Sequence, residues 1–296
     1  MTVQDALERA KQMAKAREGR VPVRPPVAPP VSRPAPPATI AVPLPAYAPN
    51  EERQTELPGF PVRPYDIEQC TQNRVLVPET RLAGNAHGAA AYRILRARLL
   101  QRVRNDNWTA VGLTSPGPSE GKSLTAINLA LTIAAERNND VFLLDLDLRN
   151  PSIARYLGVT PPRDIASFLS GDSRPEETLF SIGIEHLVLA ASATRDEHAS
   201  ELLATGRLYE LLTYLRKVST RPLVIVDMPP VLNTDDALVV APQLDAMLLV
   251  VGEGRTRRDG LERAAELLAE FNLAGIVLNH SRESLQEYYG GNYGAP

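Results

Sequence analysis

The sequence predicts an α/β fold in which helices sandwich a parallel β-sheet. Apolar strand segments alternate with helical segments from about residue 70 onward. The strand segments are apolar almost without interruption, which is typical of a sheet that is covered on both faces. Polar and charged residues directly follow three of them, at the carboxyl ends where open α/β sheets bind their ligands.

The individual elements follow from this apolar pattern. A helix is expected over residues 86–104, and crossover helices, which chain chirality makes right-handed, are expected over 122–137, 199–217 and 256–271. Strands are expected over residues 108–114, 141–146, 186–190, 223–227, 246–251 and 275–278. Together these elements predict one domain over residues 70–280. Residues 281–296 are polar and rich in tyrosine and glycine, which predicts a short mobile tail.

Two segments precede this domain. A short amphipathic helix is expected over residues 1–20, because apolar side chains repeat at helical spacing with basic residues mostly on the other side. It is either a contact for an anionic membrane surface or a partner, or a frayed solubilising tail. Residues 21–68 contain 14 of the 26 prolines, which excludes regular helix and sheet. They predict a disordered linker with polyproline II character, either a plain spacer or a docking site for a proline-recognising partner.

Composition and charge exclude several classes of function. The net charge of −3 provides no basic footprint for nucleic acid. The single cysteine, Cys70, cannot form an internal disulfide, which suits a reducing cytoplasm. No secretory signal is evident, and no apolar run approaches the roughly 18 residues of a membrane span. The four histidines are scattered and lack metal-ligand spacing. We therefore expect a cytoplasmic protein that does not bind nucleic acid.

A phosphate-binding loop is the most informative motif. The strand expected at 108–114 runs into a Gly/Pro turn, then Gly121-Lys122-Ser123, then a helix. Backbone N–H groups of such a loop and the positive end of the helix bind phosphates. Lys122 can reach the outer phosphates, and the Ser123 hydroxyl can bind a Mg²⁺ ion. The candidate nucleotide-binding residues are Gly117, Ser119, Glu120, Gly121, Lys122, Ser123 and Leu124.

The loop departs from the usual pattern at one position. The first glycine of G-x-x-x-x-G-K-S falls on Pro116, and Gly117 follows one place late. Gly-Lys-Ser by itself is also compatible with a surface turn before a helix. The strand–turn–helix context favours the phosphate loop.

Acidic residues close two further strands. Asp145 and Asp147 follow one of them, and Asp227 follows the other. At the carboxyl ends of parallel strands, such acids hold Mg²⁺ and its waters or accept a proton from an attacking hydroxyl. A single acid there is often only a helix cap or a turn former. Three such strands in one chain, one of them leading into a phosphate loop, favour a nucleotide-binding site.

In the order of these motifs, residues 80–295 resemble the bacterial tyrosine kinases of capsule and exopolysaccharide loci, especially the cytoplasmic stand-alone type. The family's phosphate loop corresponds to Gly121-Lys122-Ser123, its Asp-x-Asp-x-Arg motif to residues 145–149 and its Asp-x-Pro-Pro motif to residues 227–230. Residues 236–238, 245–251 and 275–279 also look like the family. The partitioning and division-site ATPases are related to this family and carry a signature lysine early in the loop. In this sequence Gly117 occupies the position of that lysine, which favours the kinase branch. The resemblance implies a P-loop NTPase-like fold.

The resemblance also implies a role for each site residue. Lys122 would stabilise the β- and γ-phosphates, and the Mg²⁺ ion would be held by Ser123, Asp147 and Asp227. Asp145 would orient or deprotonate the tyrosine hydroxyl. The implied acceptors, on a neighbouring subunit, are Tyr288, Tyr289 and Tyr293. The alternative interpretation of this tail is a disordered terminus that happens to contain aromatic residues.

The family's ring contact, Glu-x-x-Arg-x-x-Arg, is incomplete in this sequence. Arg93 and Arg96 are both present and mark a candidate oligomer interface, but Ala90 replaces the glutamate. This replacement weakens the expectation that rings assemble through this contact.

The expected function is that of an ATP-dependent protein-tyrosine autokinase that regulates exopolysaccharide or capsule synthesis and export. The implied partners are an inner-membrane polysaccharide copolymerase as activator, further copies of the kinase domain and a tyrosine phosphatase. Such a kinase would be cytoplasmic and peripheral to the inner membrane. One alternative is a non-kinase P-loop ATPase that acts as a nucleotide-dependent assembly switch at the membrane. Another is a degenerate adaptor without turnover, which the intact Lys122, Ser123 and three acids argue against.

Overall fold

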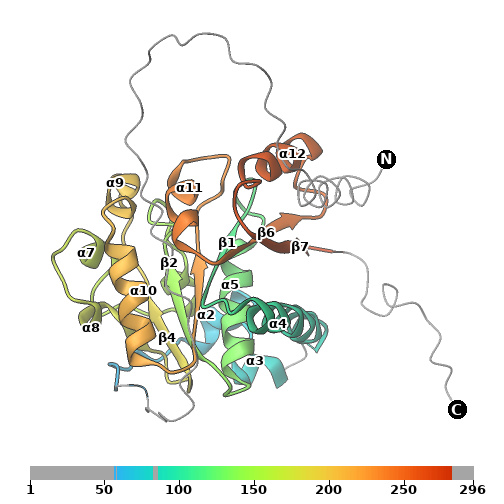
Figure 1. The fold of residues 1–296 in the computed structure, drawn as a ribbon. Helices are drawn as coiled ribbons and strands as arrows, with labels where there is room; N and C mark the ends of the chain where they lie inside the picture. Colours follow the sequence, from blue (N-terminus) through green and yellow to red (C-terminus); the bar gives the residue numbers. More distant parts are fainter. Residues whose placement is uncertain (1–56, 58, 83–85, 282–296) are drawn as a thin grey trace, which may run out of the picture. The chain divides into compact units, whose positions relative to one another are not determined.

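The structure, a computed structural model, describes residues 57, 59–82 and 86–281. Within these ranges seven strands form one sheet of order β3-β4-β2-β5-β1-β6-β7 (Figure 1). Neighbouring strands pair in parallel, except that β3 is antiparallel to β4. The expected α/β class is therefore confirmed. The strands are β1 (Ala110–Thr114), β2 (Asp140–Asp145), β3 (Phe180–Ser181), β4 (Leu187–Ala190), β5 (Pro222–Asp227), β6 (Ala246–Gly252) and β7 (Leu273–Asn279).

Three expectations concern residues outside the described ranges. They are the amphipathic helix over residues 1–20, most of the Pro-rich segment over 21–68, and the tyrosine-containing tail beyond residue 281. These expectations stay predictions.

Helices cover both faces of the sheet because its strands are apolar on both faces. In β2, Val141 and Leu143 belong to one hydrophobic cluster, whereas Phe142 and Leu144 belong to the other. The first face carries α4 (Ala86–Asp106) and α5 (Lys122–Ala134), with α2 (Ile67–Gln72), α3 (Pro78–Leu82) and α6 (Ile153–Leu157) beside them. Nearly every residue of α5 is buried, because this helix packs against both the sheet and α4.

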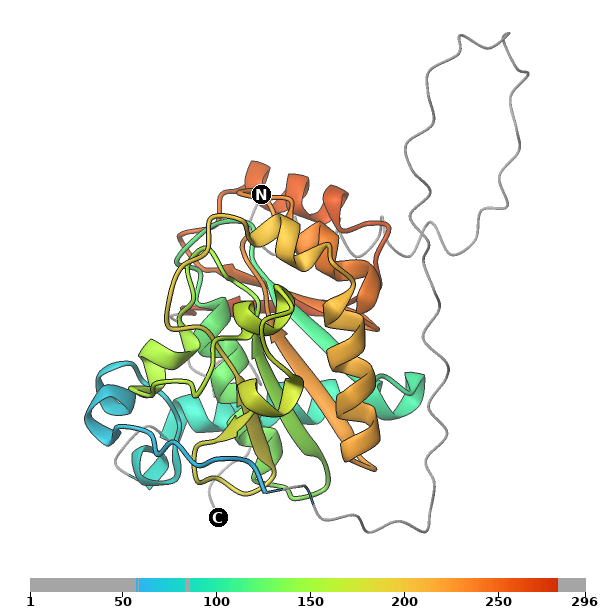
Figure 2. The same cartoon turned by 90° about the vertical axis from the view of Figure 1, so that its left-hand side faces the viewer.

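The second face carries the remaining helices. Figure 2 shows α10 running along this face of the sheet. Four leucines of α10 are buried at helical spacing, which gives this helix the apolar stripe that packs against the sheet. The helices of this face are α7 (Ile165–Leu169), α8 (Pro175–Thr178), α9 (Ala199–Leu203), α10 (Arg207–Val218), α11 (Asp236–Val240), the 3₁₀ turn η1 (Ala241–Gln243) and α12 (Arg258–Leu267).

Two expected helices differ from the observed ones. The helix expected over 199–217 is interrupted between α9 and α10, because Gly206 adopts a left-handed backbone with φ of 78°. The helix expected over 256–271 is shorter and spans α12 only. Thr256 lies before it, where its hydroxyl accepts a hydrogen bond from the Gly252 amide at 2.8 Å.

Described residues before the domain boundary expected at residue 70 already contact the domain. The segment around Val62 pairs with β3: the Arg63 amide donates to the Ser181 carbonyl at 2.8 Å, and the Ser181 amide donates to the Pro61 carbonyl at 3.0 Å. Helix α2 then follows, with its N-terminus capped by the Asp66 carboxylate. The described structure therefore includes residues 61–68, which the sequence predicts as part of the linker.

None of the helices in the described part of the chain combines the length and the apolar character needed to cross a bilayer.

Candidate active site

The phosphate loop connects β1 to α5 at the carboxyl edge of the sheet. Its backbone turns through left-handed conformations at Ser119, with φ of 61°, and at Gly121, with φ of 86°. A Cβ atom at Gly121 would overlap the Asn279 side chain. Glycine is therefore required here both by the backbone angle and by the close approach of β7. Such turns direct backbone N–H groups toward one point, as in anion-binding nests.

Side chains from two distant segments brace this loop. Arg255, in the β6–α12 connection, donates from Nη1 to the Ser119 carbonyl at 2.8 Å, and Asn279 donates from Nδ2 to the Glu120 carbonyl at 2.9 Å. The Glu120 side chain is buried and accepts a hydrogen bond from the Gly117 amide at 3.2 Å. Glu120 thus supports the loop through its side chain as well as its backbone. The sequence alone predicts no role for Arg255 or Asn279.

The segment after β5 holds the first half of the loop, where Pro116 replaces the usual glycine. The Val231 amide donates to the Ser115 carbonyl at 2.9 Å, and the Leu232 amide donates to the Pro116 carbonyl at 3.4 Å. The Ser115 hydroxyl donates to the Gly117 carbonyl at 2.7 Å. These contacts support the loop backbone around the substitution.

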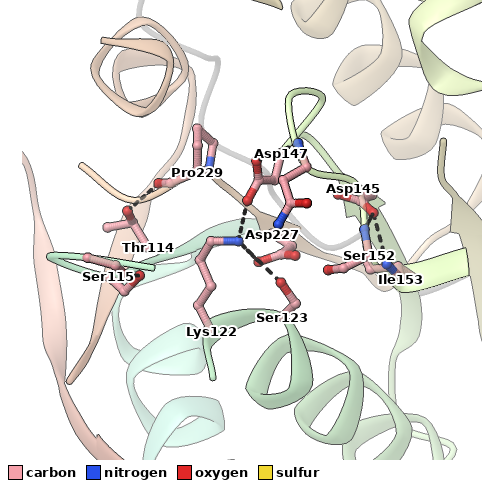
Figure 3. A network of polar contacts seen from close by, with 12 residues as sticks. Thr114, Ser115, Lys122, Ser123, Asp145, Asp147, Ser152, Ile153, Asp227 and Pro229 are labelled. Atoms are coloured by element: carbon pink, nitrogen blue, oxygen red, sulfur yellow. Dashed lines mark hydrogen bonds and ion pairs between the residues drawn. The ribbon is translucent and has the colours of Figure 1, made fainter. Parts of the chain in front are cut away.

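Three of the predicted site residues, Ser123, Asp147 and Asp227, surround the side-chain amine of a fourth, Lys122 (Figure 3). The Lys122 Nζ atom lies 2.6 Å from Asp147 Oδ2, 3.4 Å from Asp227 Oδ1 and 3.2 Å from Ser123 Oγ. All four residues are buried. Burial by itself would lower the pKa of Lys122, but Asp227 and Asp147 outweigh it and hold this pKa above its ordinary value. The amine is therefore a fixed cation beside two carboxylates.

Asp145 lies in the same cluster but makes different contacts. Its Oδ2 atom accepts hydrogen bonds from the backbone amides of Ser152 at 2.9 Å and Ile153 at 3.0 Å, at the start of α6. Its Oδ1 atom is buried and has no hydrogen-bond partner among the described residues. Burial, and then the charge of Asp227, raise the pKa of Asp145 to about 8. Asp145 is therefore a candidate proton acceptor near neutral pH.

The donor set of the cluster fits a Mg²⁺ ion. Ser123, Asp147 and Asp227 present one hydroxyl and two carboxylates, and Mg²⁺ prefers oxygen ligands. The Asp227 Oδ2 atom is buried without a hydrogen-bond partner in the described part of the chain. Mg²⁺ at nucleotide sites typically uses one or two carboxylates together with phosphate oxygens. These residues could therefore hold the ion between the protein and a phosphate chain.

Other predicted residues lie apart from this cluster. Arg93 is exposed on α4, whereas Arg96 is engaged inside its own chain. The Arg96 guanidinium forms an ion pair with Glu136 at 2.6 Å and donates to the Thr132 carbonyl at 3.1 Å. These contacts join α4 to α5 and its C-terminal end. Tyr288, Tyr289 and Tyr293 lie outside the described residues.

Comparison with known proteins identifies relatives that are named tyrosine-protein kinases. No family model matches the chain. The tyrosine-protein kinase YwqD of Bacillus subtilis (strain 168) is 29% identical over 201 residues, covering 67% of this chain and 84% of the relative. The tyrosine-protein kinase CpsD of Streptococcus pneumoniae serotype 4 is 30% identical over 193 residues, covering 63% and 82%. A putative tyrosine-protein kinase of Ralstonia solanacearum, EpsB, is 30% identical over 207 residues, but the match covers only 27% of that protein.

Solved structures agree with these relatives. The BceF tyrosine kinase domain is 26% identical with a TM-score of 0.60, and the match covers 77% of this chain and 95% of that one. The kinase domain of the Escherichia coli tyrosine kinase ETK is 26% identical with a TM-score of 0.59, covering 70% and 80%. Sequence and fold thus agree, and the chain belongs to the family of bacterial tyrosine-protein kinases of the P-loop NTPase type.

Proposed function

We propose that this chain is an ATP- and Mg²⁺-dependent protein-tyrosine autokinase that regulates exopolysaccharide or capsule synthesis. The observation that carries the proposal is the convergence of Lys122, Asp147 and Asp227 beside the phosphate loop. Phosphoryl transfer depends mainly on positioning and on charge stabilisation, so it requires such a cluster at the phosphate chain. The kinase names of the relatives support the same activity.

Each residue of the cluster has a distinct task in this proposal. Lys122 binds the outer phosphates of ATP, and its burial strengthens that attraction because the local dielectric is low. Ser123, Asp147 and Asp227 would hold the Mg²⁺ ion, which would supply neutralising charge to the phosphates. The loop amides around Ser119 to Ser123 orient the phosphate chain.

Asp145 acts as the proton acceptor for the tyrosine hydroxyl in this proposal. The tyrosine oxygen forms a bond to the γ-phosphorus, the bond from that phosphorus to ADP breaks, and the phenolic proton goes to Asp145. The Oδ1 atom is the available oxygen, since the α6 amides occupy Oδ2. Its raised pKa suits this role, because a general base works best near the operating pH.

The proposed acceptors are Tyr288, Tyr289 and Tyr293. Their support is the place where the tail begins: β7 ends at Asn279, whose side chain contacts Glu120 of the phosphate loop. The tail therefore starts at the carboxyl ends of the strands, where the nucleotide would bind. The proposed partners are a polysaccharide copolymerase of the inner membrane, a tyrosine phosphatase and further copies of this chain. The copies would contact one another through Arg93 and Arg96. The kinase would lie peripheral to the inner membrane.

Mass spectrometry of the purified chain tests the proposal. Incubation with ATP and Mg²⁺ should place phosphate on tail tyrosines, and Lys122→Ala should slow the transfer by roughly 10²–10³-fold. Phe at positions 288, 289 and 293 should abolish the label and leave ATP hydrolysis largely intact. ATP hydrolysis without any phosphotyrosine in the unmodified chain would instead identify a non-kinase ATPase switch. ATP binding without turnover would identify an adaptor.

A further inference from the structure

Arg149, the last residue of the Asp-x-Asp-x-Arg motif, makes a set of contacts that the proposed mechanism does not use. Its Nε atom lies 2.8 Å from Asp236 Oδ2 and its Nη2 atom lies 3.4 Å from Asp236 Oδ1, so the pair is bidentate. The guanidinium also donates to the Glu197 carbonyl at 3.0 Å and to the Ser200 hydroxyl at 3.0 Å. The Ser200 hydroxyl in turn contacts Asp236.

This network joins three segments that follow three different strands. Arg149 lies after β2, Ser200 lies on α9 after β4, and Asp236 begins α11 after β5. Asp236 is fully buried, with 1% of its surface exposed, whereas the Arg149 side chain is 37% exposed. A buried carboxylate needs a close cation or several donors, and here Arg149 provides both charge and geometry.

The Arg149 side of the network leads to Asp147. Arg149 belongs to the turn in which the Asn150 amide donates to the Asp147 carboxylate at 3.2 Å and to the Asp147 carbonyl at 2.9 Å. The other carboxylate oxygen of Asp147 receives the Lys122 amine. The orientation of the Asp147 side chain therefore depends on the turn that Arg149 anchors.

The Asp236 side of the network leads to Asp227 and to the phosphate loop. The chain from Asp227 to Asp236 passes along the loop, where Val231 and Leu232 bind the carbonyls of Ser115 and Pro116. Asp236 is thus attached to a segment that is hydrogen-bonded to the phosphate loop. The bond between Arg149 and Asp236 therefore fixes the position of the Asp147 turn relative to the phosphate loop.

We propose that Arg149 and Asp236 form a positioning pair that sets the Asp147 carboxylate at the Mg²⁺ site relative to the phosphate loop. The inference rests on the proposed function, because it concerns how this chain organises its site for Mg·nucleotide. Arg149 and Asp236 are positioning residues, since neither lies at the phosphate loop itself. Arginine is needed rather than lysine, because only its planar fork makes two parallel bonds to one carboxylate.

Nucleotide binding with and without Mg²⁺ tests the pair. Titration calorimetry of the full chain with ADP would compare the dissociation constant in Mg²⁺ with that in EDTA. The unmodified chain should bind ADP more tightly in Mg²⁺. Arg149→Ala and Asp236→Asn should bind ADP in EDTA within about twofold of the unmodified chain but lose roughly 10-fold of the Mg²⁺ effect, the range typical of groups that orient metal ligands. Arg149→Lys should recover only part of it.

Two controls separate positioning from damage to the fold. Arg137→Ala removes an exposed ion pair with Glu185 outside the site, and should behave as the unmodified chain. Guanidinium at millimolar concentration should restore part of the Mg²⁺ effect to Arg149→Ala, whereas equal sodium chloride should not.

Each outcome bears on a definite claim. Variants that keep the full Mg²⁺ effect, or that weaken ADP binding equally in Mg²⁺ and EDTA, would overturn the positioning pair. Loss of Mg²⁺-dependent ADP binding in the unmodified chain would overturn the proposed function, and the pair with it.

Discussion

Asp145 combines an unfavourable buried charge with a proposed catalytic task. Because burial and Asp227 raise its pKa to about 8, the folded chain holds this proton more tightly than the unfolded chain, whose aspartate pKa is about 3.9. Stability from this group is therefore fully present below the unfolded pKa, and it is lost as the pH rises toward the folded pKa. The free-energy cost of ionising Asp145 in the folded chain is therefore mostly present at pH 8 and is smaller near pH 5.

Asp145→Asn should therefore stabilise the protein while removing its activity. The amide keeps an oxygen for the Ser152 and Ile153 backbone amides but carries no charge. A gain of at least about 1 kcal/mol is expected at pH 8, or roughly 2–4 °C in Tm, with a smaller gain near pH 5. Calorimetric scans in EDTA would measure it. A lower Tm for the variant at pH 8, or an equal gain at both pH values, would contradict the assigned cause.

At the residue level, the sequence was sufficient for the central cluster but not for its supports. Lys122, Asp147 and Asp227 could be predicted because the carboxyl ends of parallel strands meet at one edge of a sheet. Arg255 and Asn279 could not, because they contact loop residues that are 136 and 159 positions away along the chain. Arg149 and Asp236 were visible as motif residues, but only the folded chain places them together.

Among the elements, β7 does more than close the edge of the sheet. It carries one asparagine at its carboxyl end and is preceded by another at its amino end. The Asn279 amide donates to the Glu120 carbonyl at 2.9 Å, and the Asn272 amide donates to the Asp245 carbonyl at 2.9 Å. The two bonds are of the same kind, but only the first touches the phosphate loop. This pair allows an internally controlled comparison.

Asn279→Ala should weaken ADP binding, and Asn272→Ala should not. A hydrogen bond of this kind contributes about 0.5–1.5 kcal/mol, so its loss at the loop should raise the ADP dissociation constant roughly 2–12-fold. Both variants should lose similar, small amounts of thermal stability. Titration with ADP alongside thermal unfolding would check the prediction. Equal ADP affinity for the two variants would show that β7 does not support the loop.

Some strands and helices could be predicted from the apolar pattern of the sequence, and others could not. The long apolar runs of β1, β2, β5 and β6 could be recognised because strands covered on both faces need no polar alternation. The two-residue strand β3 has no such run, and its pairing with the segment around Val62 depends on contacts between distant parts of the chain. The interruption at Gly206 was a single-residue signal inside an otherwise continuous helical pattern.

For the whole molecule, the two ends of the described domain lie at opposite edges of the sheet. The N-terminal segment joins the sheet at β3, and the chain leaves the sheet at the end of β7. Six strand spacings separate these edges, or roughly 29 Å at about 4.8 Å each. An anchor that acts through the N-terminal segment would therefore hold the domain by the edge away from the tail. Transfer to a neighbouring copy requires that copies be concentrated together.

The candidate ring contact offers little to bring the copies together. Ala90 supplies no carboxylate, and Arg96 is already paired with Glu136 within its own chain. An exposed ion pair contributes at most about 1 kcal/mol, but each interface of a ring would lack it. We therefore expect the free chain at micromolar concentration to be mostly monomeric and weakly active. Light scattering that found a stable, fully active ring without any partner would contradict this.

Tethering through residues 1–20 should then determine the level of tail phosphorylation in cells. A linker of about 45 residues could extend on the order of 100 Å, and tethering raises the local concentration of kinase domains without any new contact. Deleting residues 1–20 should lower tail phosphorylation in cells and leave ADP binding of the purified chain unchanged, because the deletion removes no residue of the phosphate loop or the acidic cluster. Quantitative phosphotyrosine mass spectrometry would compare the two chains at equal expression. If the deletion left cellular phosphorylation normal, residues 1–20 would not be the tether, and the copies would have to meet through the domain itself.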